Sequence, residues 1–119
     1  MRKQVVNKTH YRCLTPSLTS DKIEKYQKFL TERQIEENLN LLEVLSGEIR
    51  LKIIYLLASH TSLCVNDIAD ILKSKVSGIS HQLSILKKAR LVVSKKRQKT
   101  VFYSLNEKLP DLVLVTIKS

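Results

Sequence analysis

Apolar residues recur at helical spacing along the first half of the chain, and this pattern predicts three helices. The first begins at Asp21, the second is opened by a capping box over residues 31–34, and the third begins near Glu48. The pair Ser46-Gly47 interrupts the pattern between the second and the third. The residues expected on the buried faces are, helix by helix, Ile23, Tyr26 and Leu30; Ile35, Leu39, Leu42 and Leu45; and Ile49, Ile53, Leu56 and Leu57.

Two further helices are predicted in the second half, joined by a polar turn over residues 73–75. The run CVNDIADIL predicts a short helix that buries Val65, Ile68 and Leu72. The next helix is expected from about Val76 to Ala89. Its buried face carries Ile79, Leu83 and Leu86, and its opposite face carries a polar stripe made of Ser77, Ser80, His81, Ser84 and Lys88.

Two β-rich runs follow, over residues 91–94 and 100–103, and the polar sequence KKRQK between them predicts a hairpin tip. Residues 106–119 are expected to form a short helix, with Pro110 in its first turn. Two short helices followed by a basic hairpin are the pattern of a winged helix-turn-helix. The predicted fold is therefore mainly α with a small β-hairpin.

The charge distribution indicates what such a domain would bind. The chain has a net charge of +10, and no acidic residue lies between Asp70 and Glu107, where nine lysines and arginines lie. A solvated surface usually mixes both signs, whereas a DNA-binding surface needs uncompensated cations to replace the counterions of the phosphates. Duplex DNA is the predicted partner. The expected DNA-binding residues are Lys75, Ser77, Ser80, His81, Ser84 and Lys88 from the helix and the turn before it, and Lys95, Lys96, Arg97 and Lys99 from the hairpin.

The length of 119 residues allows one domain with a modest core. We expect a basic N-terminal arm over residues 1–20 and a DNA-binding and dimerisation domain over residues 21–119. No apolar run is long enough for a membrane span and the N-terminus lacks a signal-peptide pattern, so the expected location is cytoplasmic. There, Cys13 and Cys64 are expected to be thiols or metal ligands. The sequence has no phosphate-binding glycine loop, nucleophile elbow or HExxH pair, and it predicts no enzyme.

The run LCVNDIADILKSKVSGISHQLSILKKARLVVSKKRQKTVFYSLN resembles the ArsR/SmtB family of bacterial metal-responsive repressors. The segment LEVLSGEIRLKIIYLL just before it resembles the family's preceding helix, so the similarity extends over about residues 35–106. The combination of SHQL, ARLV and VFYSL is its most specific part. The resemblance implies a homodimer whose first and last helices pack together. It also implies repression of an operon until an inducer, often a metal ion, lowers the affinity for DNA.

The nearest subgroup is that of the cadmium, lead and zinc sensors, in which a cysteine of the fourth helix joins ligands from the other subunit's N-terminal arm. The run at residues 63–67, LCVND, keeps Cys64 and Asp67, whereas Asn66 stands where the cadmium sensors have a second cysteine. The resemblance implies a Zn, Cd or Pb site made by Cys13, Cys64, Asp67 and His10. The residues alone leave a second interpretation open, in which Cys64 binds no metal and is simply a small buried apolar side chain.

The apolar faces of the two ends predict a homodimer. Two apolar groups have no core to enter in a single winged helix: the face of Ile23, Tyr26 and Leu30, and the segment around Leu112 and Val115. Each is therefore expected to pack against a second copy of the chain. The predicted function is a sequence-specific repressor that a metal ion releases from its operator. The alternatives are a redox switch, in which Cys13 and Cys64 form a disulfide, and a winged-helix DNA-binding protein without an inducer.

Overall fold

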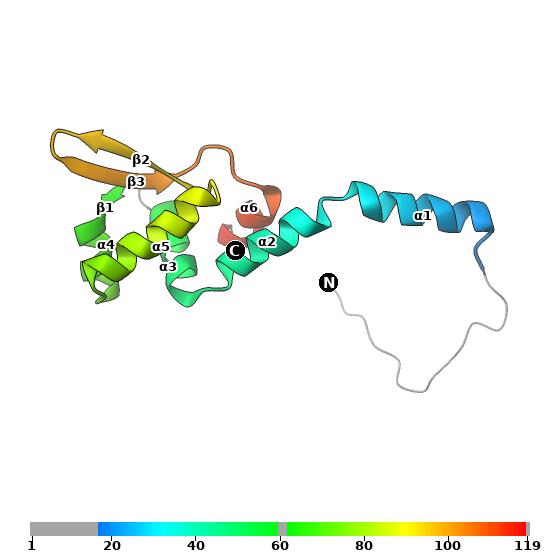
Figure 1. Ribbon diagram of the computed structural model, residues 1–119, viewed down its shortest axis with the longest axis horizontal. Helices are drawn as coiled ribbons and strands as arrows, with labels where there is room; N and C mark the ends of the chain where they lie inside the picture. Colours follow the sequence, from blue (N-terminus) through cyan, green and yellow to red (C-terminus); the bar gives the residue numbers. More distant parts are fainter. Residues whose placement is uncertain (1–16, 60–61, 119) are drawn as a thin grey trace, which may run out of the picture. The chain divides into compact units, whose positions relative to one another are not determined.

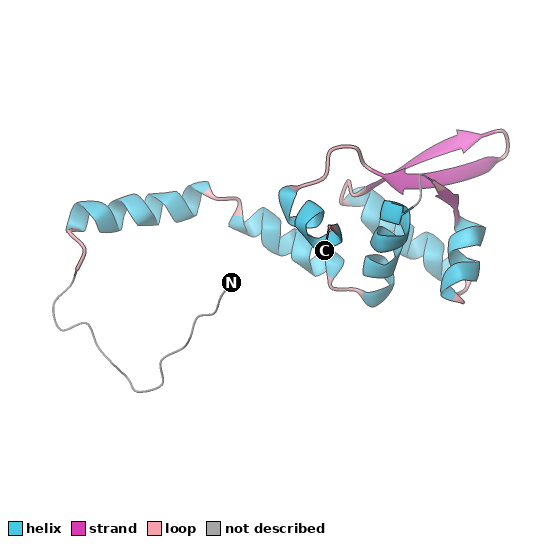
Figure 2. Cartoon of the chain, turned by 180° about the vertical axis from the view of Figure 1, so that it is seen from behind, coloured by secondary structure: helices cyan, strands magenta, loops and turns pink. Residues whose placement is uncertain are grey.

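The structure is a computed structural model that describes residues 17–59 and 62–118 (Figures 1 and 2). The chain divides into two compact units, residues 1–35 and 36–119, which are described separately. The described part contains six helices and three strands. In chain order these are α1 (Ser20–Glu32), α2 (Ile35–Leu45), α3 (Glu48–Ser59), β1 (Leu63–Cys64), α4 (Val65–Leu72), α5 (Val76–Lys88), β2 (Val92–Arg97), β3 (Thr100–Leu105) and α6 (Asp111–Ile117).

Helix α1 makes up most of the described part of the first unit. Thr19 caps its N-terminus, since the Thr19 hydroxyl oxygen accepts a hydrogen bond of 3.3 Å from the backbone N–H of Lys22. The capping box predicted at residues 31–34 is wrong. Thr31 lies inside α1, where its hydroxyl donates back to the carbonyl of Lys28 at 2.8 Å, and α2 begins only at Ile35.

The second unit is built around a core that α2 to α6 and the strands share. Helices α3, α4 and α5 supply most of it, as the helical spacing predicted. Leu39 and Leu42, expected on a buried face, are instead 59% and 48% exposed, so α2 buries only its last residue, Leu45. The buried core residues are Leu45, Ile53, Ile54, Leu57, Ile68, Ala69, Ile79, Leu83, Leu86, Leu91, Val92 and Val113.

The sheet has three antiparallel strands in the order β1-β3-β2, whereas the sequence predicted a two-stranded hairpin. The added strand is the two-residue β1, too short to leave a periodic pattern. Strand β2 extends to Arg97, which pairs with Thr100. The predicted tip KKRQK is therefore shortened to the turn Gln98-Lys99, and Gln98 has a left-handed φ of 57°.

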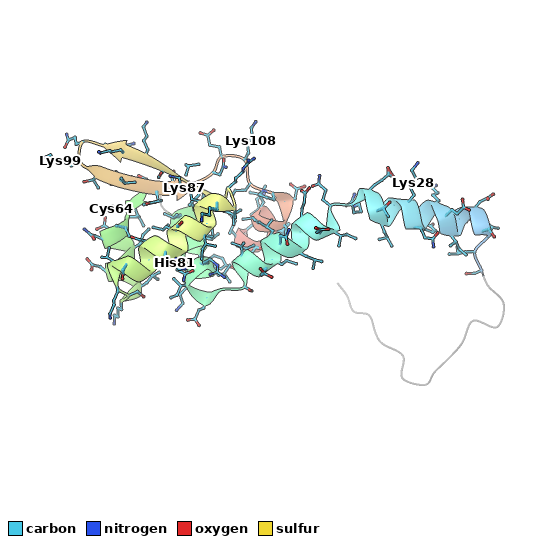
Figure 3. All side chains as sticks on the ribbon, in the orientation of Figure 1. Lys28, Cys64, His81, Lys87, Lys99 and Lys108 are labelled. Carbon is cyan, nitrogen blue, oxygen red and sulfur yellow. The ribbon has the colours of Figure 1, made fainter. Side chains whose placement is uncertain are left out.

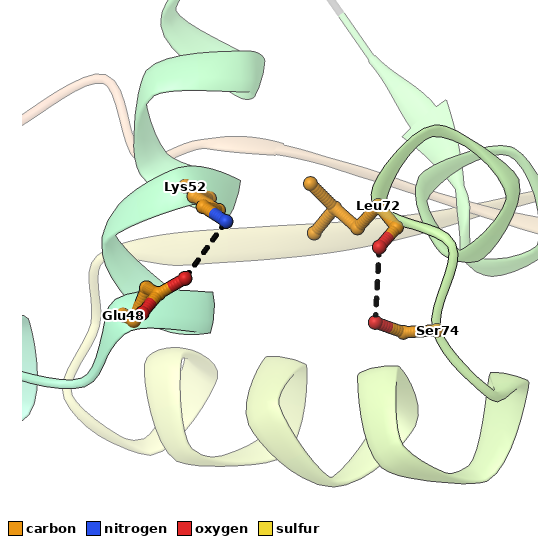
Figure 4. A network of polar contacts seen from close by, with 4 residues as sticks. All are labelled: Glu48, Lys52, Leu72 and Ser74. Carbon is orange, nitrogen blue, oxygen red and sulfur yellow. Dashed lines mark hydrogen bonds and ion pairs between the residues drawn. The ribbon is translucent and has the colours of Figure 1, made fainter.

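Both helices of the helix-turn-helix end in the same way. After α4, the Lys73 N–H donates to Asp70 and the Ser74 N–H to Ala69, while Lys73 has a φ of 53°. This is the Schellman arrangement, in which a left-handed residue closes the helix. The Ser74 hydroxyl also donates to the carbonyl of Leu72 at 3.3 Å, shown beside the Glu48–Lys52 ion pair in Figure 4. The turn that sets α4 against α5 is thus held by its own backbone.

Helix α5 closes with a second Schellman arrangement. The Arg90 N–H donates to Lys87, the Leu91 N–H donates to Leu86, and Arg90 has a φ of 64°. Leu91 and Leu86 are fully buried, which is the apolar contact that accompanies this motif. The chain therefore leaves α5 directly into the core and enters β2.

Candidate DNA-binding surface

Helix α5 presents a polar stripe to solvent. It runs over Val76–Lys88, which confirms the predicted helix to within a residue. Its core side is fixed by Ile79, Leu83 and Leu86, none more than 1% exposed. On the opposite side the residues of the predicted stripe are all exposed: Ser77, Ser80, His81, Ser84 and Lys88.

The charges around α5 suit an anionic partner. Its first turn has no acidic residue, and Lys87 and Lys88 lie in its last turn. Lys75 occupies the N-cap position and is exposed. The first backbone N–H groups of a helix carry partial positive charge and lack helical partners, so this end can receive a phosphate or a base-edge acceptor.

The hairpin of β2 and β3 carries its cations on two faces. Alternate residues of a strand point to opposite faces, so Lys95 and Arg97 share one face of β2 and Lys96 lies on the other. Lys99 is in the turn, at the free end of the hairpin (Figure 3). The sequence predicted these four residues as one group, and the register separates them.

Two contacts involve side chains of this hairpin, one beside its turn and one where β2 meets α5. The Arg97 guanidinium carbon lies 5.8 Å from the centroid of the Phe102 ring, a cation–π distance. Lys87 lies in the last turn of α5 (Figure 3), and its ammonium group donates a hydrogen bond of 2.7 Å to the hydroxyl of Ser94 in β2. The last turn of α5 is therefore joined to the face of β2 that carries Ser94 and Lys96.

A groove that the sequence did not predict lies where α5 meets the hairpin. Its volume is about 350 Å³. Lys87 and Arg90 were counted in the basic block but were not predicted as site residues, because the contact between α5 and β2 has no sequence signal. The groove is lined by Lys87, Arg90, Val92, Val93, Ser94 and Asn106.

The predicted metal ligands fall into two groups. Cys64 has a free, half-buried thiol at the N-cap position of α4, and Asp67 is exposed in the first turn of that helix. Cys64 belongs to β1 rather than to the predicted helix. His10 and Cys13 lie outside the described residues. Among residues 17–59 and 62–118, no three histidine, cysteine or acidic side chains are grouped closely enough to hold a metal ion.

Away from this surface, one ion pair shifts a pKa. The Lys52 ammonium lies 2.8 Å from the Glu48 carboxylate at the start of α3 (Figure 4). The hydrogen bond from Lys52, helped by its charge, lowers the pKa of the Glu48 carboxyl below its usual value. Both side chains are more than half exposed, so the pair is a minor contribution to the helix.

Comparison with known proteins agrees with this architecture. Residues 47–94 match the model of the bacterial regulatory protein family arsR. The chain is 32% identical over 95 residues to a cadmium resistance transcriptional regulatory protein CadC homolog of Staphylococcus aureus, covering 80% of this chain and 78% of that protein. It is 35% identical over 91 residues to the cadmium resistance transcriptional regulatory protein CadC of Listeria innocua, covering 76% of each.

Among solved structures, HlyU from Vibrio cholerae superposes with a TM-score of 0.64 at 29% identity, covering 73% of this chain and 90% of that one. The fold and the basic segment over residues 71–106, which contains no acidic residue, define a winged helix-turn-helix DNA-binding protein. The chain belongs to the ArsR family of bacterial regulatory proteins and is a transcriptional repressor of that class. The family consists of regulators rather than enzymes. No helix in the described residues is long and apolar enough to cross a membrane.

Proposed function

We propose that this protein represses transcription by reading an operator with the polar stripe of α5, and that a thiophilic divalent metal ion releases it. The exposed stripe, on a helix that itself contains no acidic residue, is the observation that carries the first part. Ser77, Ser80, His81 and Ser84 are small or planar hydrogen-bonding side chains, which a major groove about 12 Å wide admits beside the helix backbone.

The cations around the stripe would bind phosphates and set the position of α5 in the groove. Lys75 and Lys88 stand at the two ends of the helix. The hairpin cations would contact the adjacent sugar-phosphate backbone of the DNA or its minor groove; they are Lys95, Lys96, Arg97 and Lys99. Contacts of this kind raise the affinity for every sequence and carry no base specificity.

The repressor would act as a homodimer. The Ile23, Tyr26 and Leu30 side chains of α1 are 43%, 53% and 54% exposed, and Val115 of α6 is 71% exposed. Apolar side chains that are this exposed in a single chain favour burial against a second copy. A two-fold dimer would present two α5 helices to half-sites about one turn of DNA apart.

The metal ion would be held by a thiolate, carboxylate and imidazole set: Cys64 and Asp67 from one subunit, and Cys13 and His10 from the other subunit's N-terminal arm, residues 1–20. The half-buried free thiol of Cys64 and the exposed Asp67 are accessible donors for Zn(II), Cd(II) or Pb(II). The relatives named for cadmium resistance support this class of ion. Release requires that the metal bind the DNA-free dimer more tightly than the DNA-bound one.

The proposal is tested first at α5. Duplexes are selected from a random pool with the wild-type protein, and their dissociation constants are compared with those of unselected DNA for the Ser80→Ala/His81→Ala variant. We expect the preference to disappear while thermal unfolding is unchanged, because neither side chain enters the core. A variant that still prefers the selected duplex would overturn the assignment of the stripe. A wild type that selects no sequence would overturn operator recognition as a whole.

A further inference from the structure

One arginine side chain joins three helices of the second unit. Arg50, in the first turn of α3, donates from Nε to the carbonyl oxygen of Val44 in α2 at 2.6 Å. It donates from Nη1 to Oε1 of Gln82 in α5 at 2.8 Å. Both distances are short, as expected when the donor is charged. We call this set of contacts the Arg50 clamp.

The chain around Arg50 is arranged to admit its guanidinium group. Val44 lies in the last turn of α2, where carbonyl oxygens have no helical partner, so the Nε donor satisfies one of them. Gly47 leaves the space that the group occupies. A Cβ atom at Gly47 would lie 2.6 Å from both Cζ and Nη2 of Arg50, closer than real Cβ atoms approach other atoms.

The other end of the clamp lies within the DNA-reading helix. Gln82 follows His81 of the exposed stripe and precedes the fully buried Leu83. The apolar contacts of α5 hold it on the core but are not directional, whereas hydrogen bonds from a planar guanidinium group constrain orientation. The contact to Gln82 therefore restricts how α5 is rotated about its own axis.

We propose that Arg50 is a positioning residue for DNA recognition. It holds α5 through Gln82 at the rotation that presents the stripe to the major groove, and it ties that rotation to the C-terminal end of α2. This inference rests on the proposed function of α5. In this arrangement Gln82 serves as the acceptor for Arg50 and does not itself contact a DNA base.

The test uses four single variants of the full chain and one double variant. The measured quantity is the ratio of dissociation constants for unselected and selected duplexes at one salt concentration. Arg50→Met and Gln82→Met each remove one side of the contact, and we expect each to lower the ratio about tenfold. Because both break the same contact, the double variant should lose no more than either single one.

Gln82→Glu is the matched control, since its carboxylate still accepts from the guanidinium group. Its charge should weaken binding to all sequences alike and leave the ratio within about twofold of wild type. Gly47→Ala keeps both partners but displaces the guanidinium group, so it should lower the ratio as the methionine variants do. The displaced atoms are the far end of a flexible side chain, so the thermal midpoint of Gly47→Ala should stay close to that of wild type.

Three results would overturn the inference. If Gln82→Glu loses as much discrimination as Gln82→Met, Gln82 contacts DNA directly. If the double variant loses the product of the two single losses, the residues act separately. If Gly47→Ala discriminates as wild type does, the clamp does not position α5.

Hydrogen exchange of the DNA-free protein separates this inference from the proposed function. Gly47→Ala and Arg50→Met should speed amide exchange in α5 relative to α4, whether or not an operator exists. Unchanged exchange in both variants would overturn the clamp. A wild type that selects no DNA, with faster exchange in the variants, would instead retain the clamp and overturn operator recognition.

Discussion

Cys64 lies directly opposite Phe102 in the antiparallel pairing of β1 with β3. Phe102 in turn pairs with Lys95 of β2, and its ring lies under the Arg97 guanidinium group at 5.8 Å. The thiol and two of the hairpin cations therefore share one face of the sheet, separated by a single aromatic side chain. A change at Cys64 has a short physical route to the hairpin.

The first prediction concerns this thiol. Cys64→Ser keeps nearly the same size but replaces the soft ligand, so DNA affinity should stay within about threefold while release by Cd(II) disappears. Binding to a selected duplex, titrated with Cd(II) and monitored by anisotropy, measures both. Release of this variant by metal would contradict the proposed site. Release of wild type by a thiol oxidant but not by metal would point to a disulfide switch between Cys13 and Cys64.

The second prediction uses the two faces of the hairpin. Lys95→Gln/Arg97→Gln and Lys96→Gln/Lys99→Gln each remove two charges, but only the first pair lies on the Phe102 face. Each double variant should weaken binding to all sequences, and the slope of log affinity against log salt should fall by about one to two in the more affected one. We expect the two double variants to lose different amounts of DNA affinity, because a two-stranded hairpin that lies on DNA turns only one of its faces toward it. An unchanged slope in both variants would mean that the hairpin does not contact DNA.

Residue patterns predicted the elements whose faces repeat. The spacing of Ile79, Leu83 and Leu86 located α5 because its buried face recurs every three or four residues. The two-residue strand at Leu63-Cys64 has no such repeat, so the third strand could not be predicted. The exposed α2 residues were misplaced because apolar spacing marks a face but does not say what covers it.

The candidate site divides in the same way. The stripe on α5 was predictable since it follows from helix geometry alone. The contact between Arg50 and Gln82 joins residues 32 positions apart, and the one between Lys87 and Ser94 depends on the chain turning at Arg90. Neither contact follows from local spacing, because each depends on how the helices and strands pack.

The third prediction concerns Gly78 in the first turn of α5. A Cβ atom there would meet nothing within 4 Å, and its φ is not positive, so alanine fits the free protein. Gly78→Ala should raise the free energy of unfolding by roughly 0.5–1 kcal/mol, the helix propensity difference. If DNA approaches this turn closely, the added methyl group should weaken binding about tenfold. Denaturant unfolding and anisotropy test the two halves, and tighter DNA binding would contradict the close approach.

The fourth prediction uses the left-handed residue after α5. Arg90 has a φ of 64°, a conformation that costs a residue with a Cβ atom roughly 1–2 kcal/mol and glycine almost nothing. Arg90→Gly and Arg90→Ala remove the same charge, so their difference isolates the backbone. We expect Arg90→Gly to be more stable than Arg90→Ala by about 1 kcal/mol in denaturant unfolding. Equal stabilities would show that the left-handed turn carries no strain.

The last prediction concerns the apolar face of α1 and the proposed dimer. Tyr26 and Leu30 are 53% and 54% exposed in the single chain, so replacing both with glutamate costs the folded subunit little. In a dimer the same carboxylates would be buried against apolar groups, which disfavours association. Tyr26→Glu/Leu30→Glu should therefore sediment as a monomer at micromolar concentration with an unchanged helical circular dichroism signal.

The matched control changes the net charge by the same amount on the opposite side of the same helix. Lys25 and Lys28 lie more than about 130° around α1 from the centre of the apolar face, so Lys25→Gln/Lys28→Gln should remain dimeric. If both variants dissociate, charge on α1 rather than its apolar face controls association. A wild type that is monomeric at micromolar concentration would contradict the dimer itself, and with it the expectation that two α5 helices bind paired half-sites.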